Sequence, residues 1–499
     1  MCGRAPPGAR RDNPVDSGGS SVIVEACGST GGELPASGRR TGRDSAARPG
    51  SACVYSTARR SRKGRFAMLS PQIRSTFLDF FTARGHRLVP SGSLLPPDPS
   101  LLVSNAGMNQ FKPWFLGDVE PDFPRATSVQ KCVRTVDIDN IGHTRRHSTF
   151  FEMLGNFSFG DYFRTEAIGY AYELLTGYFD LSPDRLWITV YEDDDESARV
   201  WRSVGVPPER IQRLGAADNF WSMGVPGPCG PCSDVAYDRG PAYGRDGGPS
   251  VDSERFVELW SLVFMRSLRG ETEPGGGFPV LGDLPRTGID TGLGLDRLAT
   301  VLQGVDSAVQ TDLLRPTPAT VEELAGRDYS PADRDDPCRV SFEVLTDHAR
   351  AIAFLLADGI RPGKEGTEYV LRRLIRRAIR HGRRLGIEGP VLPPVTASVV
   401  ANLGPAWPEL TRAASLIEDL TTREEESFDR TLRRGTRLLD RAIRRRLEGG
   451  HRDLPAETVL TLYDSHGFPP DLTIEAAHEA GLTVDDPHVR SLLSPHHHP

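Results

Sequence analysis

The sequence predicts an α+β fold, in which a mixed sheet fills the first part of the chain and helices alone fill the second. Two runs that favour strands, residues 128–133 and 148–153, flank a polar segment rich in Asp, Asn and Gly, the pattern of a β-hairpin. Helical and strand-like segments then alternate without the regular spacing of βαβ units. Beyond about residue 338 the apolar residues recur with a helical period.

Residues 1–67 are rich in Gly, Ser, Arg and Pro and poor in large apolar side chains. Such a segment buries too little apolar surface to fold, so we expect a disordered leader. Its acidic residues argue against an organelle transit peptide. An over-extended gene start, with the protein beginning at Met68, is a second interpretation of this leader.

The first ordered element expected is a helix that begins at Ser70. Ser is a favourable N-cap, and Pro71 suits the first helical position because the amide hydrogen it lacks would have no partner there. Apolar residues with helical spacing follow, and Gly85 ends the helix. An extended run continues to Leu102.

Between the hairpin and the helical part we expect helices over 164–179 and 193–204 and a strand over 185–191. Residues 218–238 contain many Gly and Pro, which predicts a loop. Residues 254–267 form an apolar run that predicts a buried strand.

Residues 288–297 read GIDTGLGLDR. A helix starting near Leu293 would direct its positive end towards a phosphate, and the glycines would allow the backbone to approach a ligand closely. Prolines and acidic residues over 312–338 predict a linker. Two long helices, over 369–385 and 415–447, are expected after it.

The helix over 369–385 has one apolar face, with arginines around the rest. Two interpretations stay open for these arginines: they bind carboxylates of the protein or stay solvated, or they contact phosphates of a nucleic acid. The net charge of -7 excludes a generally basic nucleic-acid binder, although a local basic patch is sufficient for RNA.

Composition also limits location and cofactors. The chain of 499 residues allows two to four domains, and no apolar run is long enough to cross a membrane, so no membrane partner is expected. Seven scattered cysteines show no disulfide pattern, so a cytoplasmic location is expected. Cys229 and Cys232 form a single CxxC without a second pair, which does not predict a metal site.

The hairpin carries the side chains that a nucleotide site requires. Arg134 and the pair Arg145 and Arg146 lie at its two ends, and a guanidinium group binds phosphate through two hydrogen bonds. Phe150 and Phe151 follow on the second strand. Successive strand side chains point to opposite faces, so one phenylalanine is expected in the core and the other beside a flat ring. A solvated surface hairpin is the alternative.

The hairpin resembles motif 2 of the class II aminoacyl-tRNA synthetases, and specifically that of the alanyl-tRNA synthetase family, in TFFEM (149–153) and GNFSFGDYF (155–163). Six further segments resemble this family in the same order, within a similarity that spans roughly residues 68–489. They are NAGMNQF (105–111), DNFWSMG (218–224), GPCGPC (227–232), DTGLGLDR (290–297), EYVLRRLIRR (368–377) and LYDSHGFP (462–469).

The resemblance implies a division of the chain into an antiparallel-sheet catalytic domain (68–314), a linker (315–338), an all-helical tRNA-recognition domain (339–490) and a tail (491–499). The editing and C-terminal oligomerisation domains of the family would follow the last residue, so we expect both to be absent. The family's zinc site belongs to the editing domain, and no zinc is therefore expected.

The implied reaction joins L-alanine to ATP, used as its Mg²⁺ complex, and passes the alanyl group to the acceptor stem of a tRNA. The catalytic residues would be Arg134 at the α-phosphate, Asp290 at the alanine ammonium group, and Arg297. Phe151 and Arg297 would enclose the adenine, with Arg146 as a further ATP contact. The remaining implied contacts are Trp221, Ser261, Val263 and Gly292 for alanine, and Lys364, Arg372, Arg373 and Asp464 for tRNA.

Three motifs depart from the family's pattern. Ser261 stands where the family commonly has Asn, and Asp296 where motif 3 usually has Glu. In the third motif, Lys364 replaces an Asn that, together with the residue matching Asp464, reads a G·U pair in the acceptor stem, and Thr367 and Glu368 replace Arg and Gly. These departures raise an alternative, a paralogue that activates alanine or another small amino acid for a non-standard acceptor. A binding protein without catalysis is a third hypothesis, which the presence of the three catalytic residues disfavours.

Overall fold

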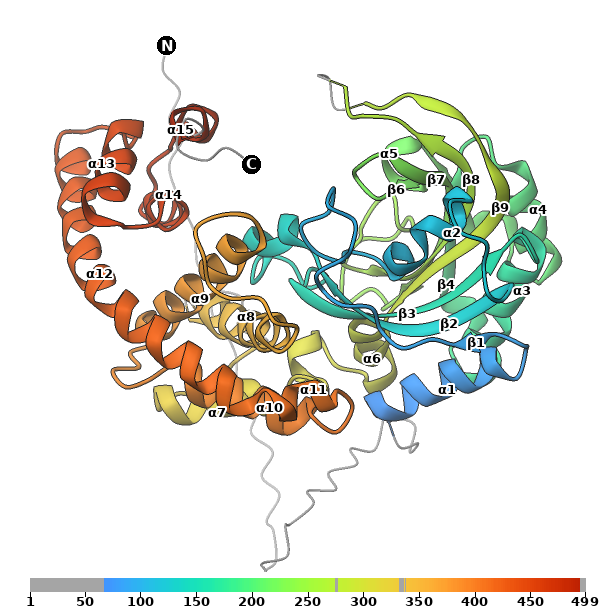
Figure 1. The fold of residues 1–499 in the computed structure, drawn as a ribbon, viewed down its shortest axis with the longest axis horizontal. Helices are drawn as coiled ribbons and strands as arrows, with labels where there is room; N and C mark the ends of the chain where they lie inside the picture. The colour runs from blue at the N-terminus through green and yellow to red at the C-terminus, as the bar shows by residue number, and fades with distance from the viewer. Residues whose placement is uncertain (1–66, 274–276, 332–335, 337, 494–499) are drawn as a thin grey trace, which may run out of the picture. The chain divides into compact units, whose positions relative to one another are not determined.

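The computed structural model describes residues 67–273, 277–331, 336 and 338–493. The predicted leader up to residue 66 and the tail from residue 494 lie outside these residues. The described chain is built on one sheet in the order β1-β2-β3-β9-β8-β7-β4-β5, with β6 paired to β7 (Figure 1). The strands are β1 (Arg87–Leu88), β2 (Arg125–Val133), β3 (Phe150–Phe159), β4 (Leu186–Tyr191), β5 (Ile211–Leu214), β6 (Phe220–Ser222), β7 (Gly227–Asp238), β8 (Phe256–Arg269) and β9 (Val280–Gly294).

The strand pairs are antiparallel except β1–β2 and β4–β5, which are parallel. Helices accompany the sheet as far as residue 303, and the described chain beyond residue 316 forms its regular structure as helices. The first group is α1 (Ser70–Thr82), α2 (Lys112–Leu116), α3 (Arg164–Glu173), α4 (Asp195–Ser203), α5 (Ala216–Asn219) and α6 (Leu295–Gln303). This division confirms the predicted α+β class.

The helical part begins with α7, which lies inside the predicted linker. Its elements are α7 (Pro316–Ala325), α8 (Arg339–Ala357), α9 (Gly366–Arg384), α10 (Leu392–Leu403), α11 (Pro408–Arg412), α12 (Ala414–Glu448), α13 (Ala456–His466), α14 (Pro470–Glu479) and α15 (Asp486–Leu493). None of the described helices is both long and apolar enough to cross a membrane.

The two faces of the sheet have different cores. On one face, α1, α3 and α6 pack against Leu154, Leu262 and Phe264 (Figure 1). The other face carries a smaller apolar cluster in which α2 packs against Phe159 and Met265. Successive side chains of β8 point to opposite faces of the sheet, so Leu262 and Phe264 lie on the first face and Ser261 and Val263 on the second.

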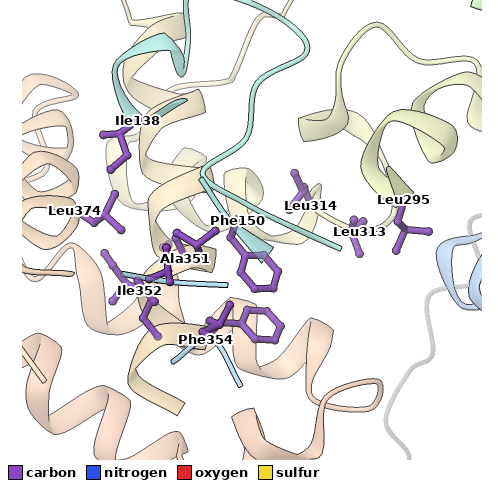
Figure 2. Packing of buried hydrophobic residues seen from close by; sticks show 14 of the residues in the cluster. Ile138, Phe150, Leu295, Leu313, Leu314, Ala351, Ile352, Phe354 and Leu374 are labelled. Carbon is purple, nitrogen blue, oxygen red and sulfur yellow. The ribbon is translucent and has the colours of Figure 1, made fainter. Parts of the chain in front are cut away.

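The predicted hairpin is confirmed as β2 and β3, which pair with Cys132 opposite Phe151 and Val133 opposite Phe150. Phe150 is fully buried and stacks on Phe354 of α8, with ring centroids 4.1 Å apart (Figure 2). Phe151 is partly exposed on the opposite face. The predicted separation of the two rings is therefore confirmed, and the larger apolar core continues from the sheet into the helical part.

The prediction of a loop over 218–238 is wrong for most of its length, because β7 pairs with both β4 and β8 within the sheet. The Gly and Pro residues are accommodated by a register shift between Cys229 and Cys232. At Gly230, a side chain would collide with the backbone oxygen of Phe264. Glycine here allows two strands to approach closely and does not mark a turn.

Prolines also begin a helix inside the segment predicted to be a linker. Pro316 and Pro318 lie in the first turn of α7, where a missing amide hydrogen costs nothing. The helix predicted from near Leu293 begins at Leu295. The prediction of Ser70 as N-cap is wrong: Leu69 is the N-cap and Ser70 is the first residue of α1, where its hydroxyl and amide both donate to the Asp312 carboxylate.

Candidate active site

A cleft of about 650 Å³ opens on the face of the sheet opposite α1, α3 and α6. This volume suits a small-molecule ligand. Every residue predicted from the sequence to bind ATP or alanine lines this one cleft, although these residues come from four strands, the loop between β2 and β3, and a helix. They are Arg134, Arg146, Phe151, Trp221, Ser261, Val263, Asp290, Gly292 and Arg297.

The register of the strands brings together the residues that are predicted to bind alanine. Val263 of β8 pairs with Cys232 of β7 on one side and with Asp290 of β9 on the other. Two residues along, Ser261 pairs in the same way with Asp234 and Gly292. These pairs form two cross-strand rows, Cys232–Val263–Asp290 and Asp234–Ser261–Gly292. Residues two apart on a strand share a face of the sheet, so both rows face the cleft.

Asp290 is the most unusual group in the cleft. The residue is only 4% exposed, and its Oδ1 atom has no hydrogen-bond partner. Burial raises the pKa of its carboxyl group from the ordinary 3.8 to about 7. A buried carboxylate that lacks a protein partner is suited to a cationic ligand, because an ammonium group would supply the missing charge and hydrogen bond.

The space beside Asp290 depends on a glycine. A β-carbon on Gly292 would lie 2.9 Å from the sulfur of Met153, so any larger residue would push against the cleft wall. Val263 and Trp221 belong to the apolar cluster of the same face. Together these residues form a small, mostly apolar recess with a carboxylate at its side.

The residues predicted to bind ATP lie around Phe151, near the start of β3. The Arg134 guanidinium carbon lies 5.0 Å from the centre of the Phe151 ring, and its Nε donates to the Asn105 carbonyl oxygen at 3.4 Å. Arg297, in the first turn of α6, donates to the carbonyl oxygens of Glu258 and Arg146. Its guanidinium group also lies 3.2 Å from the Glu258 carboxylate.

Sequence reasoning missed several acidic residues that line the cleft, among them Asp234 and Glu258. Burial, followed by the nearby charge of Glu258, raises the pKa of Asp234 to about 8. Asn219 donates to the Asp234 carboxylate at 2.9 Å, which orients it. Asp234 was missed because β7 was expected to be a loop, and a residue in a loop cannot be assigned to a face of the sheet.

The predicted tRNA residues lie outside this cleft. Lys364, before α9, and Asp464, in α13, are exposed. The Arg373 side chain lies 2.9 Å from both Asp139 and Asp471, and Arg372 lies 3.6 Å from Glu424. Carboxylates of the protein therefore hold both arginines, as in one of the two interpretations left open. Contact of these residues with tRNA stays a prediction.

Within the described residues, no cluster of three or more His, Cys, Asp or Glu side chains could hold a metal ion. Cys229 and Cys232 are both buried in β7. The Cys229 thiol donates to the Ser267 carbonyl oxygen, and burial raises the pKa of this thiol to about 11. In a buried thiol of this kind the thiolate form that ligates metals is disfavoured.

The comparisons with known proteins agree with this geometry. A family model described as tRNA synthetases class II (A) matches residues 72–498. Alanine–tRNA ligases from Streptomyces avermitilis, Frankia alni and Thermobifida fusca are each 52% identical to the chain, over 432, 426 and 433 residues. Each match covers 85% of this chain and 48% of the relative, so the chain spans about half the length of these curated relatives.

Among solved structures, an apo histidyl-tRNA synthetase of S. aureus matches with a TM-score of 0.31 and 10% identity. The match covers 49% of this chain and 70% of that chain. A likeness at this level adds nothing to the comparison of sequences.

Proposed function

The chain belongs to the class II (A) tRNA synthetase family, and we propose that it activates alanine with ATP and transfers the alanyl group to a tRNA. The observation that carries this proposal is the buried Asp290 carboxylate with an unpartnered oxygen, in one cleft with Arg134, Phe151 and Arg297. A site for an ammonium group and a site for a nucleotide thus share one space.

In the first step a carboxylate oxygen of alanine attacks the α-phosphorus of ATP, and the bond from that phosphorus to the bridging oxygen breaks. The products are alanyl-adenylate and pyrophosphate. Arg134 binds the α-phosphate and stabilises the negative charge that develops there. The adenine lies between the Phe151 ring and the Arg297 guanidinium group, which leaves Glu258 when the base enters.

Alanine is selected by size and charge in the recess formed by the two cross-strand rows. Its ammonium group pairs with Asp290, and its methyl group fits against Val263 and Trp221. Gly292 keeps the recess open because any β-carbon there would meet Met153. A small apolar recess excludes larger side chains well but rejects a small added hydroxyl group weakly.

Mg²⁺ enters with ATP, since this ion usually keeps several waters and is bound by substrate phosphates plus one or two carboxylates. Glu258 lines the cleft beside Arg297 and has an exposed carboxylate, so its chemistry fits such a contact. The ion would screen the phosphate charges while Arg134 and Arg297 orient the nucleotide.

For the transfer step, the helical part binds the tRNA acceptor stem. The exposed side chains of Lys364 and Asp464 are available for contacts in the stem. Arg372 and Arg373 would contact phosphates only after exchanging their present carboxylate partners for the nucleic acid. We therefore place them second to Lys364 and Asp464.

The test uses the 499-residue protein in two assays, alanine-dependent ATP–pyrophosphate exchange and charging of alanine tRNA. The expected result is activity in both, and loss of exchange in Asp290→Ala with the thermal transition retained. Control reactions replace alanine with valine, which the recess excludes by size. Exchange that persists in Asp290→Ala would remove the role given to this carboxylate.

The two assays also distinguish the proposed function from the alternative, a paralogue that activates alanine for a different acceptor. Exchange with alanine but no charging of alanine tRNA would indicate an activating enzyme that serves a different acceptor. The observation that favours this alternative is Lys364, whose cationic side chain occupies a position where the family reads a base pair with an amide. Absence of both activities would overturn the proposed function.

A further inference from the structure

Arg350 of α8 contacts the two segments that carry the proposed adenine-binding residues. Its guanidinium group binds both oxygens of the Asp296 carboxylate, at 3.1 and 2.6 Å, and also donates to the Phe150 carbonyl oxygen. Asp296 directly precedes Arg297, and Phe150 directly precedes Phe151. One side chain therefore joins the residues adjacent to both faces of the adenine site.

The arginine and its partners are buried. Arg350 has no exposed surface, and Asp296 is only 4% exposed. If the hydrogen bonds of Arg350 were broken, water could not replace them at this depth. The geometry of the guanidinium group therefore sets the distance between β3 and the start of α6. The stacked rings of Phe150 and Phe354, one turn of α8 after Arg350, fix the helix against the same strand (Figure 2).

Further buried charges hold the backbone around Phe151. Asp347, one turn before Arg350 on α8, accepts a hydrogen bond from the Thr149 amide at 2.9 Å. On the other side of Phe151, Glu152 is fully buried and accepts two hydrogen bonds from Arg74 of α1, both 2.6 Å long. The strand segment is thus fixed on both sides of the residue that would stack on the base.

We propose that Arg350 is a positioning residue for ATP, which sets the spacing between Phe151 and Arg297 and so determines how well the site accepts the adenine. The proposal rests on the proposed function, because it takes the base to lie between these two residues. It goes beyond that function by assigning to the helical part of the chain a role in ATP binding. Arg350 itself does not line the cleft.

The test compares two conservative variants. Arg350→Lys keeps the charge but offers one nitrogen on a shorter side chain in place of the two nitrogens that bind the Asp296 carboxylate. Asp296→Glu keeps the ion pair but adds one methylene group. Arg164→Lys is the control, because Arg164 pairs with Asp194 at 3.3 Å and is also buried, but neither residue lines the cleft. The control should lose stability without any change in ligand binding.

Three constants are measured on folded protein: KM for ATP, Ki for adenosine and KM for pyrophosphate in the exchange reaction. A displaced adenine site should raise the first two roughly tenfold, since shifts of about 1 Å have large effects on positioned groups. The pyrophosphate constant should stay within about twofold, because pyrophosphate carries no adenine and does not contact Phe151 or the base-stacking side of Arg297. Adenosine binding is also measured by calorimetry, which requires neither alanine nor tRNA.

The outcomes distinguish the two proposals. A wild type that binds adenosine but fails to activate alanine would refute the proposed function, while the variants would still test Arg350 by calorimetry. If Arg350→Lys does not yield folded protein, Asp296→Glu decides the question. Variants that lose thermal stability but keep the wild-type constants would show a structural role only. An equal rise in all three constants would show a disturbance of the whole site and not of the adenine site. Either result would overturn the proposal.

Discussion

Replacing Asp290 by Asn should stabilise the protein while it abolishes activation of alanine. The buried carboxyl group has a pKa of about 7 in place of the ordinary 3.8. Between these two pH values the folded protein keeps a proton that the unfolded chain has lost, so the stability contributed by this group falls as the pH rises through this window. The full cost is present above pH 7, and the Asn side chain avoids it.

The difference between the two pKa values corresponds to a destabilisation of about 4 kcal/mol at pH 8, at about 1.36 kcal/mol per pKa unit. At pH 5, where the carboxyl group of the folded protein is still mostly protonated, the destabilisation is about 2 kcal/mol. For domains of roughly 150–250 residues, about 1 kcal/mol moves Tm by roughly 2–4 °C, so a rise of several degrees is expected at pH 8.

The assay is thermal unfolding of wild type and Asp290→Asn without ligands at both pH values. Asp194→Asn is the matched control, since this carboxylate is buried but hydrogen-bonded to Ser197 and paired with Arg164, and its loss should lower Tm. A gain in Asp290→Asn that is equal at pH 8 and pH 5, or absent at pH 8, would refute the reasoning. Such a result would mean that ionisation of Asp290 does not lower the stability of the folded protein.

Three further predictions follow from the same geometry. The kcat/KM for alanine in exchange should fall up to about tenfold per pH unit below pH 7, because protonated Asp290 cannot pair with an ammonium group; a flat profile between pH 5.5 and 7 would contradict this. Gly292→Ala should raise the KM for alanine but leave that for ATP unchanged, because its β-carbon meets Met153; equal effects on both constants would argue against the placement of the amino acid. Phe354→Ala should cost about 3–5 kcal/mol in urea unfolding, since it removes the ring stacked on Phe150, and a cost below 1 kcal/mol would show that the core collapses around the gap.

The hairpin shows what sequence could predict. Alternation along a strand required that Phe150 and Phe151 face opposite sides, and the family resemblance assigned the exposed ring to the base. Local patterns also located α1, α3, α4, β4, β8, α9 and α12 to within a few residues. Such elements form from signals that lie within one stretch of chain, namely periodicity, strand-forming residues and terminal Pro or Gly.

What could not be predicted depends on contacts between distant segments. β7 was taken for a loop because Gly230 is favoured by the approach of β8 and not by any local preference. Asp234 faces the cleft only through the register of that strand. Likewise, nothing in the sequence of α9 shows that Arg373 is held by Asp139 and Asp471, which lie more than 90 residues away on either side.

The recess proposed to bind the amino acid depends on which side chains of β7, β8 and β9 face the same side of the sheet. This dependence limits where residues can be added to the chain. A single residue inserted in the middle of β8 would turn Ser261 and Val263 to the opposite face and bring Leu262 into the recess. Two inserted residues would restore the face but place each side chain beside a different neighbour. Insertions into the connection between β7 and β8, residues 239–255, leave the alternation unchanged. Variants of this protein with an altered preference in the proposed amino-acid recess should therefore be sought by substitution within the strands, with changes in chain length confined to such connections.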